Sequence, residues 1–156
     1  MKITDLLSDK VIRIPLKNTD KRKIIEEMVD ILDKAYKLKN RDAVLEAVFK
    51  REHAMSTGMG DGVAIPHAKS EHVNQLLAAF GVTKTNVDFE SIDDKPVRLV
   101  FLLVGPTDQT GPHLKALSRI SRLMHRAEFR DTLSHAKNGK QVIKAIRAEE
   151  KKYFPM

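Results

Sequence analysis

The longest uninterrupted apolar segment of the chain extends from Leu99 to Val104 and is bounded by Arg98 and Gly105. It is far shorter than the run of about 20 apolar residues that a membrane-spanning helix needs. With Val97 added, the segment has almost no alternation of apolar and polar residues, which predicts a central strand covered on both faces. Such a strand needs a packed layer on each side, so the segment indicates an α/β architecture.

Hydrophobic periodicity predicts helices before and after this strand. Ile24, Met28, Leu32 and Tyr36 recur every four residues, and residues 18–20 offer N-caps for that helix. Further helices are expected from about residue 40 to before residue 58, and near 111–125, 128–136 and 139–152. A second strand is expected at 76–82, and a short strand or extended arm at 11–14. The sequence therefore predicts one α/β domain over residues 1–156, a sandwich with a mixed β-sheet flanked by helices.

Composition narrows the possible functions. The 156 residues include no cysteine, which excludes disulfides, thiolate metal sites and cysteine nucleophiles. The formal net charge is +7, but aromatic residues make up only 5% of the chain. The scarcity of side chains for base stacking argues against nucleic acid, and an acidic protein partner fits the charge at least as well. Residues 1–10 carry acidic side chains where a signal peptide needs an apolar stretch, so we expect a cytoplasmic protein without membrane insertion.

Residues 56–67 combine a glycine-rich segment with a histidine. Three of the seven glycines of the chain lie at positions 58, 60 and 62, which predicts a loop or turn and then a short strand that Pro66 ends. The backbone of His67 would thereby be fixed, with loop N–H groups able to approach an anion. Imidazole titrates near neutral pH and is a competent nucleophile, so His67 is a candidate phosphoryl acceptor. The alternative is an ordinary polar residue at a strand end.

His113 and Arg51 are further candidates. Pro112 suits the first position of a helix, which places His113 in the first turn, on the apolar arc of that helix. The free N–H groups of a helix N-terminus favour a phosphate, and a second histidine there would hydrogen-bond its oxygens. The alternative for His113 is a satisfied core histidine. Arg51, at the expected end of the second helix, would fork onto phosphoryl oxygens, or is a solvated surface arginine.

No cofactor or metal is expected. The glycine segment lacks the Gly-Lys-Ser/Thr ending of a P-loop and precedes a strand rather than a helix, and His67 and His72 lack the spacing of metal ligands. Two basic stripes have residues spaced by 4, 3 and 4 positions, so each lines one face of a predicted helix. The first would flank a docking surface, although a solvated helix face is the alternative for both. The stripes are Lys115, Arg119, Arg122 and Arg126, and Lys140, Lys144, Arg147 and Lys151.

Two motifs in this order resemble a known family. The first is Arg51-Glu52 followed by Ser56-Thr57-Gly58-Met59-Gly60-Asp61-Gly62-Val63-Ala64-Ile65-Pro66-His67, and the second is Pro106-Thr107-Asp108-Gln109-Thr110 with His113-Leu114 and Leu117-Ser118. Together they resemble the enzyme IIA domain of the bacterial phosphoenolpyruvate-dependent sugar phosphotransferase system, in its fructose/mannitol/nitrogen-regulatory family. The resemblance extends over nearly the whole chain. Asp61 stands where the family commonly has asparagine, and Ala68 where it commonly has glycine.

The resemblance implies a mixed sheet flanked by helices and a phosphohistidine mechanism without metal or nucleotide. His67 matches the phosphorylated histidine of the family and His113 its second active-site histidine. The histidine-containing phosphocarrier protein would donate a phosphoryl group to Nε2 of His67, while His113 and Arg51 stabilise the group in transfer. An enzyme IIB would then accept it on cysteine.

The chain has neither a cysteine nor a membrane segment, so it would be a freestanding enzyme IIA that serves a separate IIB or a regulatory target protein. Residues 108–110 slightly favour the nitrogen-regulatory branch over the fructose branch. The competing hypothesis is a non-enzymatic basic binding module for acidic proteins or nucleic acid, whose affinity would fall steeply with salt and would not need His67.

Overall fold

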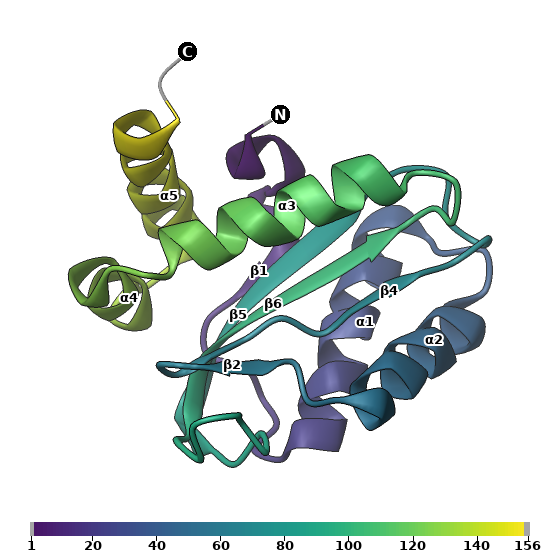
Figure 1. The fold of residues 1–156 in the computed structure, drawn as a ribbon, viewed down its shortest axis with the longest axis horizontal. Helices are drawn as coiled ribbons and strands as arrows, with labels where there is room; N and C mark the ends of the chain where they lie inside the picture. Colours follow the sequence, from purple (N-terminus) through teal and green to yellow (C-terminus); the bar gives the residue numbers. More distant parts are fainter. Residues whose placement is uncertain (1, 155–156) are drawn as a thin grey trace.

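The computed structural model describes residues 2–154 as a mixed sheet between layers of helices (Figure 1). Two short 3₁₀ helices, η1 (Ile3–Leu6) and η2 (Asp9–Val11), precede the sheet. The strands are β1 (Ile12–Arg13), β2 (Gly58–Gly60), β3 (Val63–Ala64), β4 (His67–Lys69), β5 (Leu77–Val87) and β6 (Val97–Gly105). The α-helices are α1 (Lys21–Tyr36), α2 (Arg41–Ala54), α3 (Thr110–Leu123), α4 (Ala127–Ser134) and α5 (Gly139–Tyr153).

The sheet is mixed, as predicted. Its strand order is β1-β5-β6-β3-β2, and β4 also pairs with β6. β5 runs antiparallel to β6, whereas β3 and β4 run parallel to β6 and occupy successive stretches of its edge. Every residue of β6 except Arg98 is buried, which confirms the prediction of a central strand covered on both faces.

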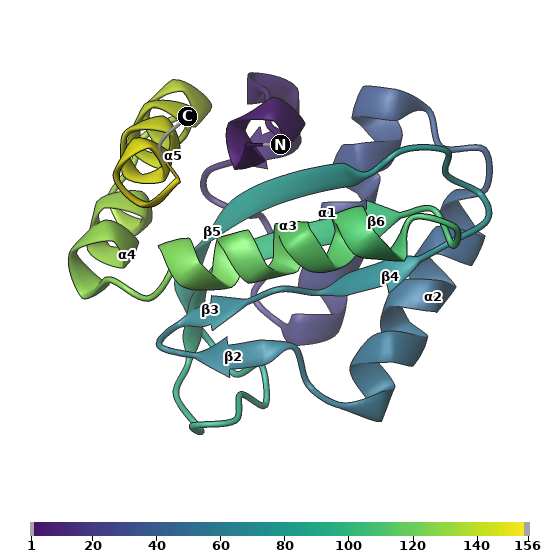
Figure 2. The same cartoon turned by 45° about the horizontal axis from the view of Figure 1, so that its top comes forward.

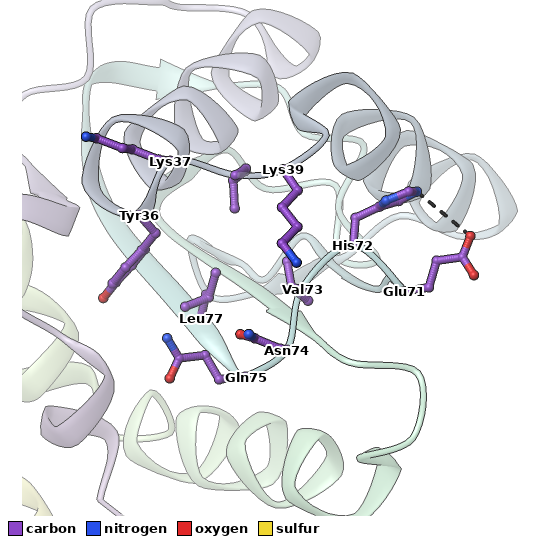
Figure 3. Close-up of a pocket in the computed structure, with 10 residues that line it drawn as sticks. Tyr36, Lys37, Lys39, Glu71, His72, Val73, Asn74, Gln75 and Leu77 are labelled. Carbon is purple, nitrogen blue, oxygen red and sulfur yellow. Dashed lines mark ion pairs between the residues drawn. The ribbon is translucent and has the colours of Figure 1, made fainter.

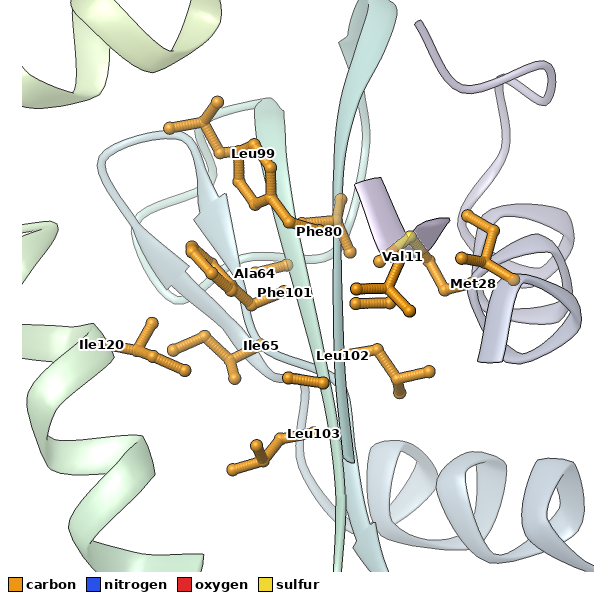
Figure 4. Close-up of a cluster of buried hydrophobic side chains, with 14 of the residues drawn as sticks. Val11, Met28, Ala64, Ile65, Phe80, Leu99, Phe101, Leu102, Leu103 and Ile120 are labelled. Atoms are coloured by element: carbon orange, nitrogen blue, oxygen red, sulfur yellow. The ribbon is translucent and has the colours of Figure 1, made fainter. Parts of the chain in front are cut away.

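Helices cover both faces of this sheet. In Figures 1 and 2, α1 and α2 lie on one face and α3 crosses the other. Figure 4 shows the alternation along β6 that serves both layers: Leu102 points to the side of Met28 in α1, and Leu103 to the side of Ile120 in α3. The α/β sandwich is thus confirmed. Within residues 2–154, no helix is long and apolar enough to cross a membrane.

Side-chain caps fix where three of the helices begin. The carboxylate of Asp20 accepts the N–H of Lys23 at 3.0 Å, which confirms an N-cap within residues 18–20. Asn40 caps α2 and Asn138 caps α5 in the same way, each through its side-chain oxygen. Because these oxygens satisfy N–H groups that lack an intrahelical acceptor, they set the first residue of each helix.

The glycine-rich segment differs from the prediction. Residues 58–60 form strand β2, which pairs antiparallel with β3, so the segment is a hairpin and not an anion-binding loop. Its turn contains positive φ angles at Gly60, Asp61 and Gly62, the backbone region that glycine adopts most easily. Asp61 therefore lies at the tip of a hairpin, where its N–H donates to the carboxylate of Asp93 at 3.0 Å.

Pro66 interrupts the strand rather than ending it. The carbonyl of Pro66 accepts the N–H of Leu103 at 3.0 Å, and β4 resumes at the next residue, with His67 opposite Leu103. A proline lacks only the N–H donor, so its carbonyl still bonds to the neighbouring strand. His67 consequently starts a strand, instead of standing at the end of one. The second predicted strand is also longer than expected, because β5 continues from residue 83 to Val87 with exposed polar side chains at 84–86.

Candidate functional site

The three predicted site residues come together in one open pocket. Arg51 lies in the last turn of α2, His67 at the start of β4, and His113 in the first turn of α3. These elements line a pocket of about 550 Å³. The residues around it are Ala47, Lys50, Arg51, His67, Ala68, Lys69, Thr110, His113, Leu114 and Leu117. Asp61, the departure from the asparagine that is common in the family, does not line this pocket.

A backbone carbonyl sets the tautomer of His67. The Nδ1 atom lies 2.7 Å from the carbonyl oxygen of Ile65. A carbonyl only accepts hydrogen bonds, so Nδ1 carries the proton in the neutral ring and Nε2 keeps a free lone pair. Burial is the main cause that lowers the pKa of His67 below its ordinary value, and the positive charge of Arg51 adds to it. Together they outweigh the Ile65 carbonyl and the negative charge of Glu52, which raise the pKa. The neutral form, which is the nucleophile, is thereby favoured at neutral pH.

His113 is buried beside His67. Its side chain is only 4% exposed, and the two ring centroids are 5.8 Å apart. The prediction that His113 faces the interior is confirmed. Burial is the main cause that lowers the pKa of His113 to about 4, and the charges of His67 and Lys69 add to it. The ring is therefore neutral at pH 7 and has a single N–H to donate.

The Nδ1 atom of His113 has no hydrogen-bond partner within residues 2–154. It lies against the backbone of β6: a Cβ atom added to Gly105 would be only 3.0 Å from it. The absence of a side chain at Gly105 thus makes room for the imidazole. Sequence analysis did not identify Gly105 as a site residue, since it looked only like the end of a strand.

The helix that holds His113 begins slightly earlier than predicted. α3 starts at Thr110, so Pro112 is its third residue and not its first. The position remains suitable for proline, since the N–H groups of the first turn have no intrahelical acceptor. The N–H of His113 already donates to the carbonyl of Gln109 at 3.2 Å, and is therefore occupied. An anion at this helix end would meet the preceding N–H groups instead.

Arg51 reaches the pocket from the end of α2. Its Nη1 atom donates to the carbonyl of Met55 at 3.0 Å, which caps its own helix. Its charge also acts on the pKa of His67. A guanidinium has five N–H donors, so most of them stay available to an anion in the pocket.

Lys69 is a basic residue of the pocket that sequence analysis missed. It lies two residues after His67 in β4, on the same face of the strand, and its Nζ atom donates to Thr110 Oγ1 at 3.2 Å. Period-two alternation after His67 would have found it. Leu114, with 59% of its side chain exposed, and the partly buried Leu117 add an apolar rim on α3.

Two residues of the first basic stripe, Arg119 and Arg126, form ion pairs within the fold, whereas Lys115 and Arg122 are exposed. Arg119 is 16% exposed at its side chain, lies 3.7 Å from Glu150 Oε2, and its guanidinium carbon is 4.3 Å from the centroid of the Phe154 ring. Arg126 lies 3.1 Å from the buried Glu149. The prediction that this stripe flanks a free docking surface is therefore wrong for these two arginines. Arg119 joins α3 to α5, and Arg126, which follows the end of α3 and is the N-cap residue of α4, joins the start of α4 to α5. The second stripe, on α5, is exposed.

A separate hollow lies between the end of α1 and the segment that joins β4 to β5 (Figure 3). Its residues include Tyr36, Lys39, Asn74 and an ion pair between His72 and Glu71, whose atoms are 3.9 Å apart. None of the three predicted site residues lines it. The two histidines and the arginine therefore lie together in the first pocket and not in this hollow.

A half-buried histidine with a free Nε2 lone pair, a second neutral histidine and an arginine in one open pocket define a class of protein that can hold an anionic group on imidazole. The chain belongs to the family described as "Phosphoenolpyruvate-dependent sugar phosphotransferase system, EIIA 2", whose model matches residues 5–149. Domains of this kind are phosphotransferase components that carry phosphoryl groups on histidine. The match supports a phosphoryl-carrier role over a non-enzymatic basic binding module.

Relatives of two kinds are similar in sequence. The fructose-specific EIIABC component of Bacillus subtilis is 43% identical over 97% of the chain, which spans only 24% of that protein. The fructose-specific EIIA component of Haloferax volcanii is 36% identical over 80% of each protein. The nitrogen regulatory protein of Bradyrhizobium diazoefficiens is 35% identical over 94% of the chain and 95% of its own length.

Solved structures agree with the fold. The nitrogen regulatory protein IIA-Ntr from Neisseria meningitidis has a TM-score of 0.86 and 33% identity, and the match covers 92% of the chain and 98% of that protein. The Escherichia coli enzyme IIA for mannitol, solved in a complex with phosphorylated enzyme IIB, has a TM-score of 0.79. That match covers 91% of the chain and 97% of the mannitol protein, and at 18% identity it shows likeness of fold.

Proposed function

We propose that His67 is the residue that accepts the phosphoryl group, that His113 hydrogen-bonds the group in transfer, and that Arg51 stabilises its charge. The observation that carries this proposal is the 2.7 Å contact between His67 Nδ1 and the Ile65 carbonyl. Because the contact occupies Nδ1, it leaves the lone pair of Nε2 for attack on phosphorus. The neighbouring histidine and arginine supply donors for the phosphoryl oxygens.

The transfer conserves the phosphoryl group and needs no other reactant. Nε2 of His67 attacks the phosphorus of a phosphohistidine on the donor, so one N–P bond forms while the donor's N–P bond breaks and its electron pair returns to the donor imidazole. Onward transfer forms a bond from phosphorus to the acceptor atom as the His67 N–P bond breaks. Catalysis is then mainly positioning and charge stabilisation, which these side chains provide.

The donor in this proposal is the histidine-containing phosphocarrier protein. In a transport role, the acceptor is a cysteine of a separate enzyme IIB. In a regulatory role, the phosphorylation state itself is the signal to a target protein. Both roles are supported by similar proteins, one fructose-specific and one nitrogen-regulatory. We further propose that residues 1–156 act as one IIA unit in the cytoplasm, where the phosphocarrier would meet it.

The test is a phosphorylation assay read by intact mass. The protein is incubated with phosphoenolpyruvate, the first enzyme of the system and the phosphocarrier protein. We expect one acid-labile phosphoryl group on the wild type, none on His67→Ala, and slower labelling of His113→Ala that still maps to His67. Unchanged labelling of His67→Ala, or phosphate on His113 instead of His67, would overturn the assignment.

Transfer onward separates the two downstream roles. The phosphorylated protein is mixed with candidate enzyme IIB domains, and loss of its phosphoryl group is followed by mass. Rapid transfer to the cysteine of a IIB supports the transport role. A protein that keeps its phosphoryl group while its binding to a regulatory target changes supports the regulatory role.

A further inference from the structure

We propose that Glu52 is a positioning residue for phosphoryl transfer, which acts on His67 through a chain of hydrogen bonds from Glu52 to Thr57, to Ile65 and to His67 Nδ1. This inference rests on the proposed function of His67, and it assigns a role to a buried carboxylate that the transfer chemistry itself does not use. The chain links the end of α2 to the start of β4 through the first residue before β2.

The first link lies at the end of α2. Glu52 is 7% exposed, and its carboxylate accepts the N–H of Thr57 at 3.0 and 3.1 Å and the Oγ1 hydroxyl of the same residue at short range. The ammonium of Lys21 lies 2.8 Å from Glu52 Oε1 and balances its charge. The buried Thr57 is therefore held at both its backbone and its side chain.

The next links lead to the nucleophile. The carbonyl of Thr57 accepts the N–H of Ile65 at 3.0 Å, one residue beyond the paired residues of the β2–β3 hairpin. The carbonyl of Ile65 then accepts from His67 Nδ1 at 2.7 Å. Displacement of Thr57 would therefore move the one carbonyl that fixes the tautomer and the ring orientation of His67.

The chain transmits position rather than charge. The N–H and the C=O of Thr57 belong to different peptide groups, and so do those of Ile65, so polarisation of one bond does not pass through a shared amide to the next. What each link fixes is the place of the following residue. The expected consequence of losing Glu52 is a mixture of His67 tautomers, in which part of the population has its proton on Nε2 and cannot attack phosphorus.

Stability alone is a weak reason for a carboxylate in this place. Removing a carboxylate and an ammonium from water costs several kcal/mol for each ion, and apolar pairs of similar size are often as stable or better. Glu52 accepts from a hydroxyl and a backbone amide and pairs with an ammonium. Among the hydrogen bonds described above, those of Glu52 are the ones that connect the helix of Arg51 to the segment that leads to His67. Ordering of the site accounts for this arrangement.

The experiment uses two pairs of variants of the full chain. Glu52→Gln is compared with Glu90→Gln, which removes the other carboxylate at Lys21, 3.3 Å from its ammonium and 75% exposed at its side chain. Thr57→Val, which replaces the hydroxyl with a methyl group, is compared with Thr57→Ser, which keeps the hydroxyl. Two quantities are measured on each protein: the ¹⁵N shifts of the His67 imidazole, which report the tautomer, and the rate of phosphorylation by the phosphocarrier protein.

We expect Glu52→Gln to show a mixed tautomer and a rate about tenfold lower, the smaller end of what loss of an orienting partner costs. Thr57→Val should change in the same direction, while Thr57→Ser and Glu90→Gln should match the wild type. If Glu52→Gln does not fold, the two Thr57 variants decide. A wild-type tautomer in Thr57→Val, or an equal effect of Glu90→Gln, overturns the inference.

The two proposals fail in different ways. If wild-type His67 takes no phosphoryl group, the proposed function is wrong, and the imidazole shifts still decide whether Glu52 controls the tautomer. If His67 is phosphorylated but neither the shifts nor the rate respond to Glu52→Gln, only the positioning role is wrong.

Discussion

Gly105→Ala should impair phosphoryl transfer by displacing His113. The added Cβ atom would lie 3.0 Å from His113 Nδ1 and 3.0 Å from Leu76 Cδ1. Ordinary van der Waals contacts of a Cβ atom begin at about 3.4 Å, so each neighbour has to yield by a few tenths of an ångström. The Leu76 methyl is the end of a flexible side chain and can move aside. The imidazole of His113 is buried and is attached to helix α3, so it can move less than the Leu76 methyl.

The magnitude follows from that displacement. Overpacking of this kind costs about 1–3 kcal/mol of stability, which most domains tolerate. Misplacement of a positioning group by about 1 Å can slow a reaction by about 10²-fold. For a shift of a few tenths of an ångström, we expect transfer to and from His67 to be slowed by roughly tenfold while the variant remains folded.

Gly111→Ala is the matched control. It makes the same chemical change two residues before His113, but a Cβ atom there has nothing within 4 Å. It should leave transfer at the wild-type rate and stabilise α3 slightly, by about 0.5–1 kcal/mol, because alanine has the higher helix propensity. Rates are measured by rapid mixing with the phosphorylated phosphocarrier and quenching, and stability is measured by urea unfolding.

Equal rates for Gly105→Ala, Gly111→Ala and the wild type would refute the reasoning. They would mean either that His113 moves without consequence or that the ring does not contribute to transfer. A slow Gly111→Ala would contradict it as well, because the effect would then come from the helix end and not from the space at Gly105.

Three further predictions concern the site and its support. The pKa of His113 is lowered to about 4 in the folded protein, so between pH 4 and 6.5 the unfolded chain binds more protons than the folded one. The free energy of unfolding should therefore fall by up to roughly 3 kcal/mol as the pH drops through that window. His113→Gln should remove this part of the pH dependence, as measured by urea unfolding at several pH values. Arg51→Lys should keep the fold but slow transfer by about tenfold in the same rapid-mixing assay, because an ammonium lacks the planar fork; a wild-type rate would return Arg51 to the surface arginines. Glu150→Gln replaces the buried carboxylate, which accepts the N–H groups at the start of η1 and pairs with Arg119, by a neutral amide. The free energy of unfolding should fall by about 1–3 kcal/mol, against less than about 0.5 kcal/mol for Glu128→Gln at an exposed site.

Local patterns in the sequence were enough to predict the helices, the two long strands and the fold class, but not β2 or β4. The unbroken apolar segment predicted a central strand, and the four-residue period from Ile24 predicted α1, because burial on both faces and burial on one helix face leave different traces in the order of residues. Asp20 was among the expected caps for the same local reason. His67, His113 and Arg51 were identified from short motifs and from a family resemblance, without any knowledge of their distances.

The tertiary structure decided what those residues touch. The burial of His113 against Gly105 and the hydrogen bond between Thr57 and Ile65 depend on how the chain folds back on itself. The contact of His67 Nδ1 with the Ile65 carbonyl is local in the sequence, but it depends on the backbone and ring conformations that the fold sets. Stripe residues on α3 show the limit most clearly. A 4-3-4 spacing says which residues share a helix face, but it does not say whether water or another helix lies opposite. Arg119 pairs with the buried Glu150 of α5. That pairing depends on the packing of α3 against α5, which no local pattern encodes.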